Sequence, residues 1–131
     1  MARTHLADVL VVTQAAFAAE RAKLQTLKKR ESDLRAQLAQ LIQARDDRAQ
    51  GGDEIADAAL TAGADVRWHH WIAGRRTTIN NELLQVIAQQ GRQLTAVRRS
   101  FGKTEAVKEL VKRDAASRAV IAARRTRDVP G

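Results

Sequence analysis

A seven-residue repeat of apolar side chains runs through the first part of the chain and constrains its fold more than any other feature. The repeat has two rows, which are Leu10, Phe17, Leu24, Glu31 and Leu38, and Leu6, Thr13, Glu20, Leu27, Leu34 and Leu41. Placed at the a and d positions of a heptad, the rows form one stripe along a helix. Such a stripe stabilises a helix only when another helix covers it, because each buried Leu contributes about 1.5–3 kcal/mol. The polar members Thr13, Glu20 and Glu31 lower stability but help to fix the register of the partner helix.

The repeat ends at Gly51-Gly52, which we interpret as a turn because glycine reaches the left-handed conformation at little steric cost. An Ala-rich stretch, 53–62, predicts a short helical piece before Gly63, and helical periodicity resumes at Asp65. The expected organisation is therefore a first coiled-coil helix over 1–50, a turn with a short helical segment over 51–64, and a second coiled-coil helix over 65–127.

The second apolar stripe also advances by alternating steps of three and four residues. Its expected members are Leu83, Ile87, Gln90, Leu94, Val97, Phe101, Thr104, Lys108 and Val111, and Trp68, Ile72 and Ile79 continue it upstream with a small shift in phase. A shift of this kind changes the supercoil locally.

Two stripes separated by one turn predict an all-α fold in which two long antiparallel helices form a coiled-coil hairpin. With the turn at Gly51-Gly52, Phe101 would face the start of the chain, and the second helix would overhang beyond it as a basic C-terminal extension. Two other arrangements fit the same pattern. One is a compact three-helix bundle with breaks at Gly63, Gly91 or Gly102, and the other pairs the stripes between two chains.

The composition argues against an enzyme. The chain has two Trp, two Phe and no Tyr, which predicts a thin core, and a rod of two helices has no pocket large enough to exclude water. It has no Cys for thiolate metal sites, and the adjacent His69 and His70 point about 100° apart on a helix, so they cannot chelate one ion. No G-x-x-x-x-G-K-[ST] stretch is present, and Gly51-Gly52 lacks the following Lys and Ser or Thr that would hold phosphates. We expect no catalytic residue, no metal and no cofactor.

The N-terminal apolar run Val9–Val12 is too short to span a membrane. We therefore expect a soluble protein that is not exported.

Two tryptophans close together near the turn are unusual for a thin coiled coil. Trp68 and Trp71 lie three residues apart, and indoles are enriched at the energetic centres of protein interfaces. This predicts a partner-binding surface formed by Trp68, Trp71, Ile72, Ile79 and Leu83. In the alternative interpretation, both indoles pack over 53–62 and close the end of the seam.

The C-terminal third carries most of the formal net charge of +8 and predicts an anionic partner. The candidate binding residues are Arg98, Arg99, Lys103, Lys108, Lys112 and Arg113. The region lacks the interleaved aromatic residues that stack on single-stranded nucleic acid, which favours an acidic protein surface over nucleic acid as the partner.

Three segments that follow the heptad arm and the Gly-containing turn make the combination recognisable: Arg67-Trp68-His69-His70-Trp71-Ile72, Ile79-Asn80-Asn81-Glu82-Leu83, and Arg98-Arg99-Ser100-Phe101-Gly102-Lys103. Together they resemble the FliJ family of flagellar export proteins and its YscO-type relatives in virulence type III secretion. Members of that family are two-helix antiparallel rods similar to the central stalk of rotary ATPases.

The resemblance implies a non-enzymatic stalk and escort protein of a flagellar or type III protein export apparatus. Such a protein inserts into a hexameric export ATPase, contacts the membrane export gate and escorts empty export chaperones, at the cytoplasmic side of the inner membrane. On this chain, Trp68 to Leu83 would meet the gate or the chaperones, and Arg98 to Arg127 would meet the ATPase ring. The family usually has an aromatic or large apolar residue where Gly74 and Arg75 stand.

Two other functions fit the residues. A basic coiled coil could bind nucleic acid, in which case affinity would fall steeply with salt. A homodimeric structural scaffold would be twice the chain mass by light scattering, whereas a hairpin that pairs within one chain would be monomeric.

Overall fold

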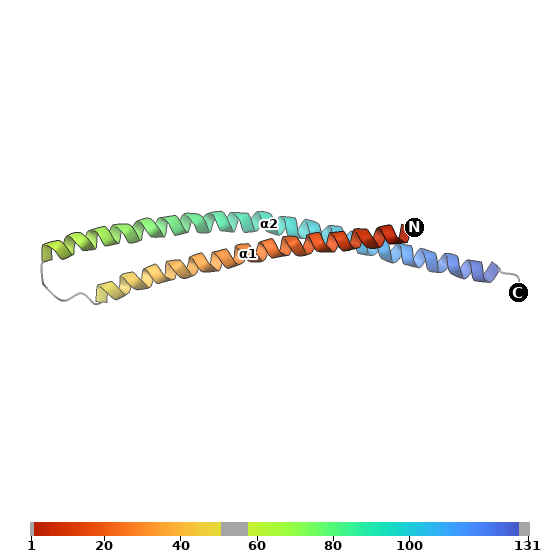
Figure 1. Ribbon diagram of the computed structural model, residues 1–131, viewed down its shortest axis with the longest axis horizontal. Coiled ribbons are helices and arrows are strands. Elements are labelled where there is room, and N and C mark those ends of the chain that lie inside the picture. The colour runs from red at the N-terminus through yellow and green to blue at the C-terminus, as the bar shows by residue number, and fades with distance from the viewer. Residues whose placement is uncertain (1, 51–57, 129–131) are drawn as a thin grey trace. The chain divides into compact units, whose positions relative to one another are not determined.

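The computed structural model describes the backbone of residues 2–50 and 58–128, and the side chains of 5–50 and 61–128. All of these residues are helical. Helix α1 spans Ala2–Gln50 and helix α2 spans Ala58–Asp128, in that order along the chain (Figure 1). The predicted all-α hairpin of two long antiparallel helices is confirmed, because the two helices pack against each other.

Helix α2 starts earlier and runs further without interruption than the sequence indicates. It begins at Ala58, whereas Asp65 was the expected start, and the described part of the predicted turn segment, 58–64, is continuous helix. The helix also passes through Gly63, Gly91 and Gly102, where a three-helix bundle would break. A single glycine costs a helix only about 1 kcal/mol, which packing along a long seam offsets. The predicted turn at Gly51-Gly52 lies outside the described residues.

The stripe of α1 faces α2 as its repeat predicts. In the described part of α1, both predicted rows are buried or half-buried, from Leu6 through Leu34 to Leu41, while the residues between them are mostly exposed. This includes the polar members Thr13, Glu20 and Glu31, which are half-buried. The heptad therefore places polar groups inside the seam.

The register between the helices differs from the predicted one. Phe101, expected opposite the chain start, has its ring centroid 5.6 Å from that of Phe17. Gln93 likewise lies opposite Glu20 and Thr104 lies opposite Thr13, so each of these α2 residues faces a later α1 residue than a turn at Gly51-Gly52 would give.

The altered register shortens the overhang of α2. Leu6 and Ala7 of α1 line a groove with Val111 and Arg118 of α2, so α1 accompanies α2 as far as Arg118. Only the last turns of α2 extend further, and the side chains of 119–128 are all exposed. The prediction that everything after Phe101 overhangs is therefore wrong, and the basic stretch from Arg98 to Arg113 lies beside α1.

One of the two inward rows of α2 also differs from the prediction. Leu83, Gln90, Val97, Thr104 and Val111 face inward as expected. The other row, however, consists of Val86, Gln93, Ser100 and Val107, while the predicted members Ile87, Leu94, Phe101 and Lys108 are exposed.

Hydrogen bonds between polar residues of the two helices explain which row of α2 faces inward. The polar seam residues of α1 receive polar partners, with Gln93 donating to the backbone carbonyl of Glu20 at 2.9 Å and Thr104 donating to that of Thr13 at 3.2 Å. The same rotation places Val107 in the seam and leaves the Lys108 ammonium in water, which avoids the cost of burying a charge.

The predicted phase shift of the upstream stripe is present. Buried or half-buried residues follow one another at Trp68, Ile72, Arg76 and Ile79, with steps of four, four and three. An eleven-residue spacing of this kind locally unwinds a left-handed supercoil. It also draws Arg76 toward the seam, where its Nε atom is buried without a hydrogen-bond partner among the described residues.

Contacts divide the chain into two units, each containing a part of both helices. The core unit is Gln25–Gly91, and the terminal unit is Met1–Leu24 with Arg92–Gly131. The core unit holds a dry cluster of Leu34, Ile79, Leu83 and Val86, with Leu38 and Leu41 packed against it. In the described part of the terminal unit, the only buried side chain is that of Thr104, so its seam is more polar.

Candidate partner-binding surfaces

The two tryptophans of the core unit occupy different environments. Trp68 is half-buried beneath the Arg48 guanidinium, which lies 4.5 Å from its ring centroid, and His69 meets its edge at 5.1 Å. Trp71, in contrast, is 57% exposed. Because residues three apart on a helix are about 60° apart around its axis, Trp68 reaches α1 while Trp71 points outward.

Arg48 is held over Trp68 by an acidic residue of α2. Its Nε and Nη2 atoms donate to Oδ1 of Asp65 at 3.1 and 2.7 Å, so the flat guanidinium is fixed in position. A planar cation suits an indole face better than a Lys ammonium does. The sequence interpretation missed Arg48, because nothing in the sequence sets the register that brings it to Trp68. In the alternative interpretation both indoles pack over 53–62, and most of the side chains of 53–62 lie outside the described residues.

The other three residues of the predicted tryptophan surface are buried. Ile72, Ile79 and Leu83 are at most 7% exposed, and they lie in the seam between α1 and α2. They cannot touch a partner while the helices are paired. Trp71 is thus the member of the predicted set that offers a largely open apolar side chain.

Trp71 stands in a positively charged setting. On α2 its nearest neighbours, three or four residues away, include the exposed Arg67, Gly74 and Arg75. Arg75 donates to Gln37 of α1 at 3.4 Å, and Arg67 forms no ion pair with a described residue. Gly74 leaves open space beside the indole, since a Cβ atom there would meet nothing within 4 Å.

The six predicted basic residues of the terminal unit are all exposed, but they differ in their ion pairs. Lys108 contacts Glu105 at 3.2 Å, and Arg113 contacts Glu109 at 3.4 Å. The remaining four have no ion pair within the described part of the chain, and they are Arg98, Arg99, Lys103 and Lys112. These four supply uncompensated positive charge.

The basic residues lie on two opposite flanks of the helix pair. Arg99 and Lys103 line a hollow together with Thr13, Glu20 and Ser100, in which Ala16 and Ala96 leave room because of their small side chains; we name this hollow the alanine groove. Arg98 lies on the other flank, because it is three or four residues from Leu94 and Phe101 on α2. The sequence pattern alone does not separate these two groups.

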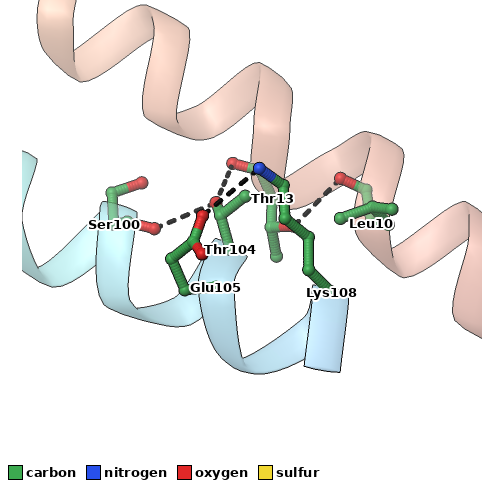
Figure 2. A network of polar contacts seen from close by, with 6 residues as sticks. All are labelled: Leu10, Thr13, Ser100, Thr104, Glu105 and Lys108. Carbon is green, nitrogen blue, oxygen red and sulfur yellow. Dashed lines mark hydrogen bonds and ion pairs between the residues drawn. The ribbon is translucent and has the colours of Figure 1, made fainter. Parts of the chain in front are cut away.

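A network of hydrogen bonds links α1 to α2 between these two flanks. Figure 2 shows the Thr104 hydroxyl within reach of the backbone carbonyls of Thr13 and Ser100, at 3.2 and 3.0 Å, so that it can donate to either. Thr13 donates its own hydroxyl to the carbonyl of Leu10 at 2.9 Å. The buried Thr104 therefore links α2 to α1 in the terminal unit.

A second polar link lies in the core unit. Gln90 donates from Nε2 to the backbone carbonyl of Leu27 at 3.3 Å and to the Glu31 carboxylate at 3.0 Å. Hydrogen bonds from Arg35, and then from Gln90, hold the pKa of Glu31 below its ordinary value. These groups join helices to each other. Within the described residues no three His, Cys, Asp or Glu side chains are grouped to hold a metal ion.

Comparison with known proteins adds no relative: no protein-family model, curated protein or solved structure matches the chain. Within the described residues, no helix is both apolar enough and long enough to cross a bilayer.

Proposed function

We propose that the protein is a non-enzymatic stalk and escort component of a flagellar or type III export apparatus. In this role it couples a hexameric export ATPase to the membrane export gate and to export chaperones, from the cytoplasmic side of the inner membrane. The proposal rests on the resemblance of the Trp68 and Arg98 segments to the FliJ and YscO proteins and on an all-α helical hairpin that fits the family.

The observation that carries the proposal is the presence of two unlike exposed features on different units. The core unit presents Trp71, an open indole flanked by arginines, and the terminal unit presents the four uncompensated cations on its two flanks. An indole suits a hydrophobic socket on a gate domain or chaperone. Uncompensated cations are attracted into a ring lined by carboxylates, because long-range attraction speeds and orients association.

The ATPase contact is tested by charge reversal in the terminal unit. Replacing Arg98, Arg99 and Lys103 with Glu is expected to abolish the stimulation of the cognate export ATPase. In the matched control, three exposed residues of α1 are replaced with Glu, so that the net charge changes by the same amount; they are Lys23, Lys28 and Lys29. Full stimulation by the first variant, or equal loss in both, would count against a stalk contact at this position.

The gate or chaperone contact is tested at the exposed indole. Trp71→Ala is expected to weaken capture of the export-gate cytoplasmic domain by about tenfold or more, the usual size for a central interface tryptophan. Leu84→Ala is the control, because Leu84 is an equally open apolar residue of the core unit. Unchanged capture by Trp71→Ala would remove the indole from the mechanism.

Nucleic-acid binding is the second candidate, and the four cations without ion pairs favour it. If this were the function, affinity for duplex DNA would drop steeply with salt, and the triple Glu variant would abolish it. Weak, salt-sensitive DNA binding combined with intact ATPase stimulation would support the export role instead.

A further inference from the structure

Helix α2 has more apolar surface than α1 covers. Its two inward rows contact α1, yet Leu94 and Phe101, which are seven residues apart, form a third row. The Leu94 side chain is 37% exposed and that of Phe101 is 50% exposed. In the core unit Ile87 occupies the same heptad position and is 43% exposed. A strict two-helix coiled coil has two apolar rows in each helix, whereas a helix with a third row belongs to a bundle of three or more helices.

The third row borders a shallow aromatic surface in the terminal unit. The ring of Phe101 packs against that of Phe17 with an interplanar angle of 49°, and the Arg21 guanidinium lies 5.5 Å from the Phe17 ring centroid. We name the surface formed by Phe17, Leu94 and Phe101 the phenylalanine flank. It lies on the opposite side of the helix pair from the alanine groove, because Lys103, which lines that groove, is two residues after Phe101 and therefore about 160° away around α2.

Cations border the phenylalanine flank on both helices. Arg21 lies on the α1 side, and Arg98 lies between Leu94 and Phe101 on the α2 side. Neither arginine forms an ion pair with a described residue. A helix that covers Leu94 and Phe101 with an apolar face would bring its flanking residues close to both guanidinium groups, and acidic residues there would be favoured.

We propose that the phenylalanine flank binds an acidic amphipathic helix of a partner protein, which completes a three-helix bundle with α1 and α2. A second copy of the chain fits less well. A symmetric contact would place Arg21 and Arg98 of each copy against the same cations of the other, on a chain whose net charge is already +8. The proposal does not depend on the export role, since it concerns a surface and a helix chemistry that are measured without an ATPase or a gate.

The absence of cysteine allows a site-specific reporter. Ala18 and Ala19 are adjacent exposed residues of α1, and a single Cys at either position can carry an environment-sensitive dye. Ala18 is three residues before Arg21 and so lies toward the phenylalanine flank, whereas Ala19 is three residues after Ala16 and lies toward the alanine groove. Both labelled positions are exposed, so they differ mainly in the flank of the helix pair toward which they lie.

The probe is a synthetic helical peptide of about three heptads with Leu at the a and d positions, Glu at e and g, and Ala elsewhere. We expect it to bind the full chain, to shift the emission of the dye at Ala18 and to leave the dye at Ala19 nearly unchanged. The same peptide with Lys in place of Glu, and a scrambled acidic peptide, are expected not to bind. Binding by the Lys peptide, or a stronger response at Ala19, would overturn the proposal.

Matched variants locate the contact. Leu94→Ala is expected to weaken binding of the acidic peptide about tenfold, while Leu110→Ala changes it by less than about twofold. Leu110 is 50% exposed on the same helix, but it lies seven residues after Lys103 and so on the side of the alanine groove. Equal effects of the two substitutions would refute the assignment.

Charge reversal tests the flank without touching its apolar residues. Arg21→Glu with Arg98→Glu is expected to weaken peptide binding about tenfold at low salt, and the difference should shrink as salt is added. Both side chains are exposed, so the variant is expected to keep its helical circular dichroism. Unchanged binding would refute the charge argument. A chain dimer without peptide that Phe101→Glu dissociates would show that a second copy occupies the flank.

Discussion

Replacing Ile79 with Ala tests which face of α2 meets α1. The Ile79 side chain is fully buried at 0% exposure, in the cluster with Leu34, Leu83 and Val86. Removing buried methylene groups from such a site costs the transfer free energy of those groups and leaves a cavity, and the loss is about 2–5 kcal/mol. We therefore expect Ile79→Ala to lower the free energy of unfolding by about 3 kcal/mol.

Ile87 supplies the matched control, because it has the same side chain on the same helix and in the same unit. It is 43% exposed, so truncation gives up only part of the transfer free energy and leaves no closed cavity. Alanine also has a better helix propensity than isoleucine, by a few tenths of a kcal/mol. We expect Ile87→Ala to change the free energy of unfolding by less than about 1 kcal/mol.

Urea titration followed by circular dichroism at the helical minimum measures both changes. With a slope of about 2 kcal/mol per molar urea, the Ile79 variant should unfold at a midpoint about 1.5 M below that of the parent. The Ile87 variant should stay within about 0.5 M of the parent. If the two substitutions lowered the midpoint equally, the row of Ile87, Leu94 and Phe101 would face α1, as the sequence pattern predicts, and the rotation of α2 described here would be refuted.

Three further predictions concern polar contacts. Because the pKa of Glu31 is lowered in the folded state, its stabilising contribution is present above the ordinary carboxyl pKa and is lost as the pH falls through the lowered value. We therefore expect Glu31→Gln to reduce the loss of stability at acidic pH, measured as the free energy of unfolding against pH. An unchanged loss at acidic pH would contradict this. Arg48→Ala should raise acrylamide quenching of Trp68, measured in a chain whose other tryptophan is replaced, whereas no increase would mean that the guanidinium does not shield the ring. Thr104→Val keeps the side-chain volume but removes the hydroxyl that links the helices, so we expect a loss of about 0.5–1.5 kcal/mol in urea unfolding, and a more stable variant would argue against that link.

The candidate surfaces were partly predictable from the sequence. The concentration of basic residues from Arg98 to Arg113 and the pair of tryptophans are visible in the sequence itself. Their accessibility is not, because it depends on which residues of α1 lie opposite. Arg48 covers Trp68 and leaves Trp71 open, and this pairing follows from the register between two helices that are far apart in sequence.

The sequence by itself determined the helical class and the inward face of α1, and it predicted the hairpin while leaving a three-helix bundle and pairing between two chains open. A heptad repeat in which seven of eleven seam positions are Leu has only one side that can be buried, so local periodicity is sufficient there. That repeat also assigned the polar members to the seam, namely Thr13, Glu20 and Glu31.

Only the tertiary structure decided the register and the rotation of α2. Its pattern offers two competing apolar rows one residue apart, Val86 to Val107 and Ile87 to Lys108, and hydrophobicity alone favours the second through Leu94 and Phe101. The first row is inward because its Gln93 meets the polar Glu20. This condition depends on the partner helix, so no local pattern in α2 contains it. The same outcome leaves Leu94 and Phe101 partly exposed.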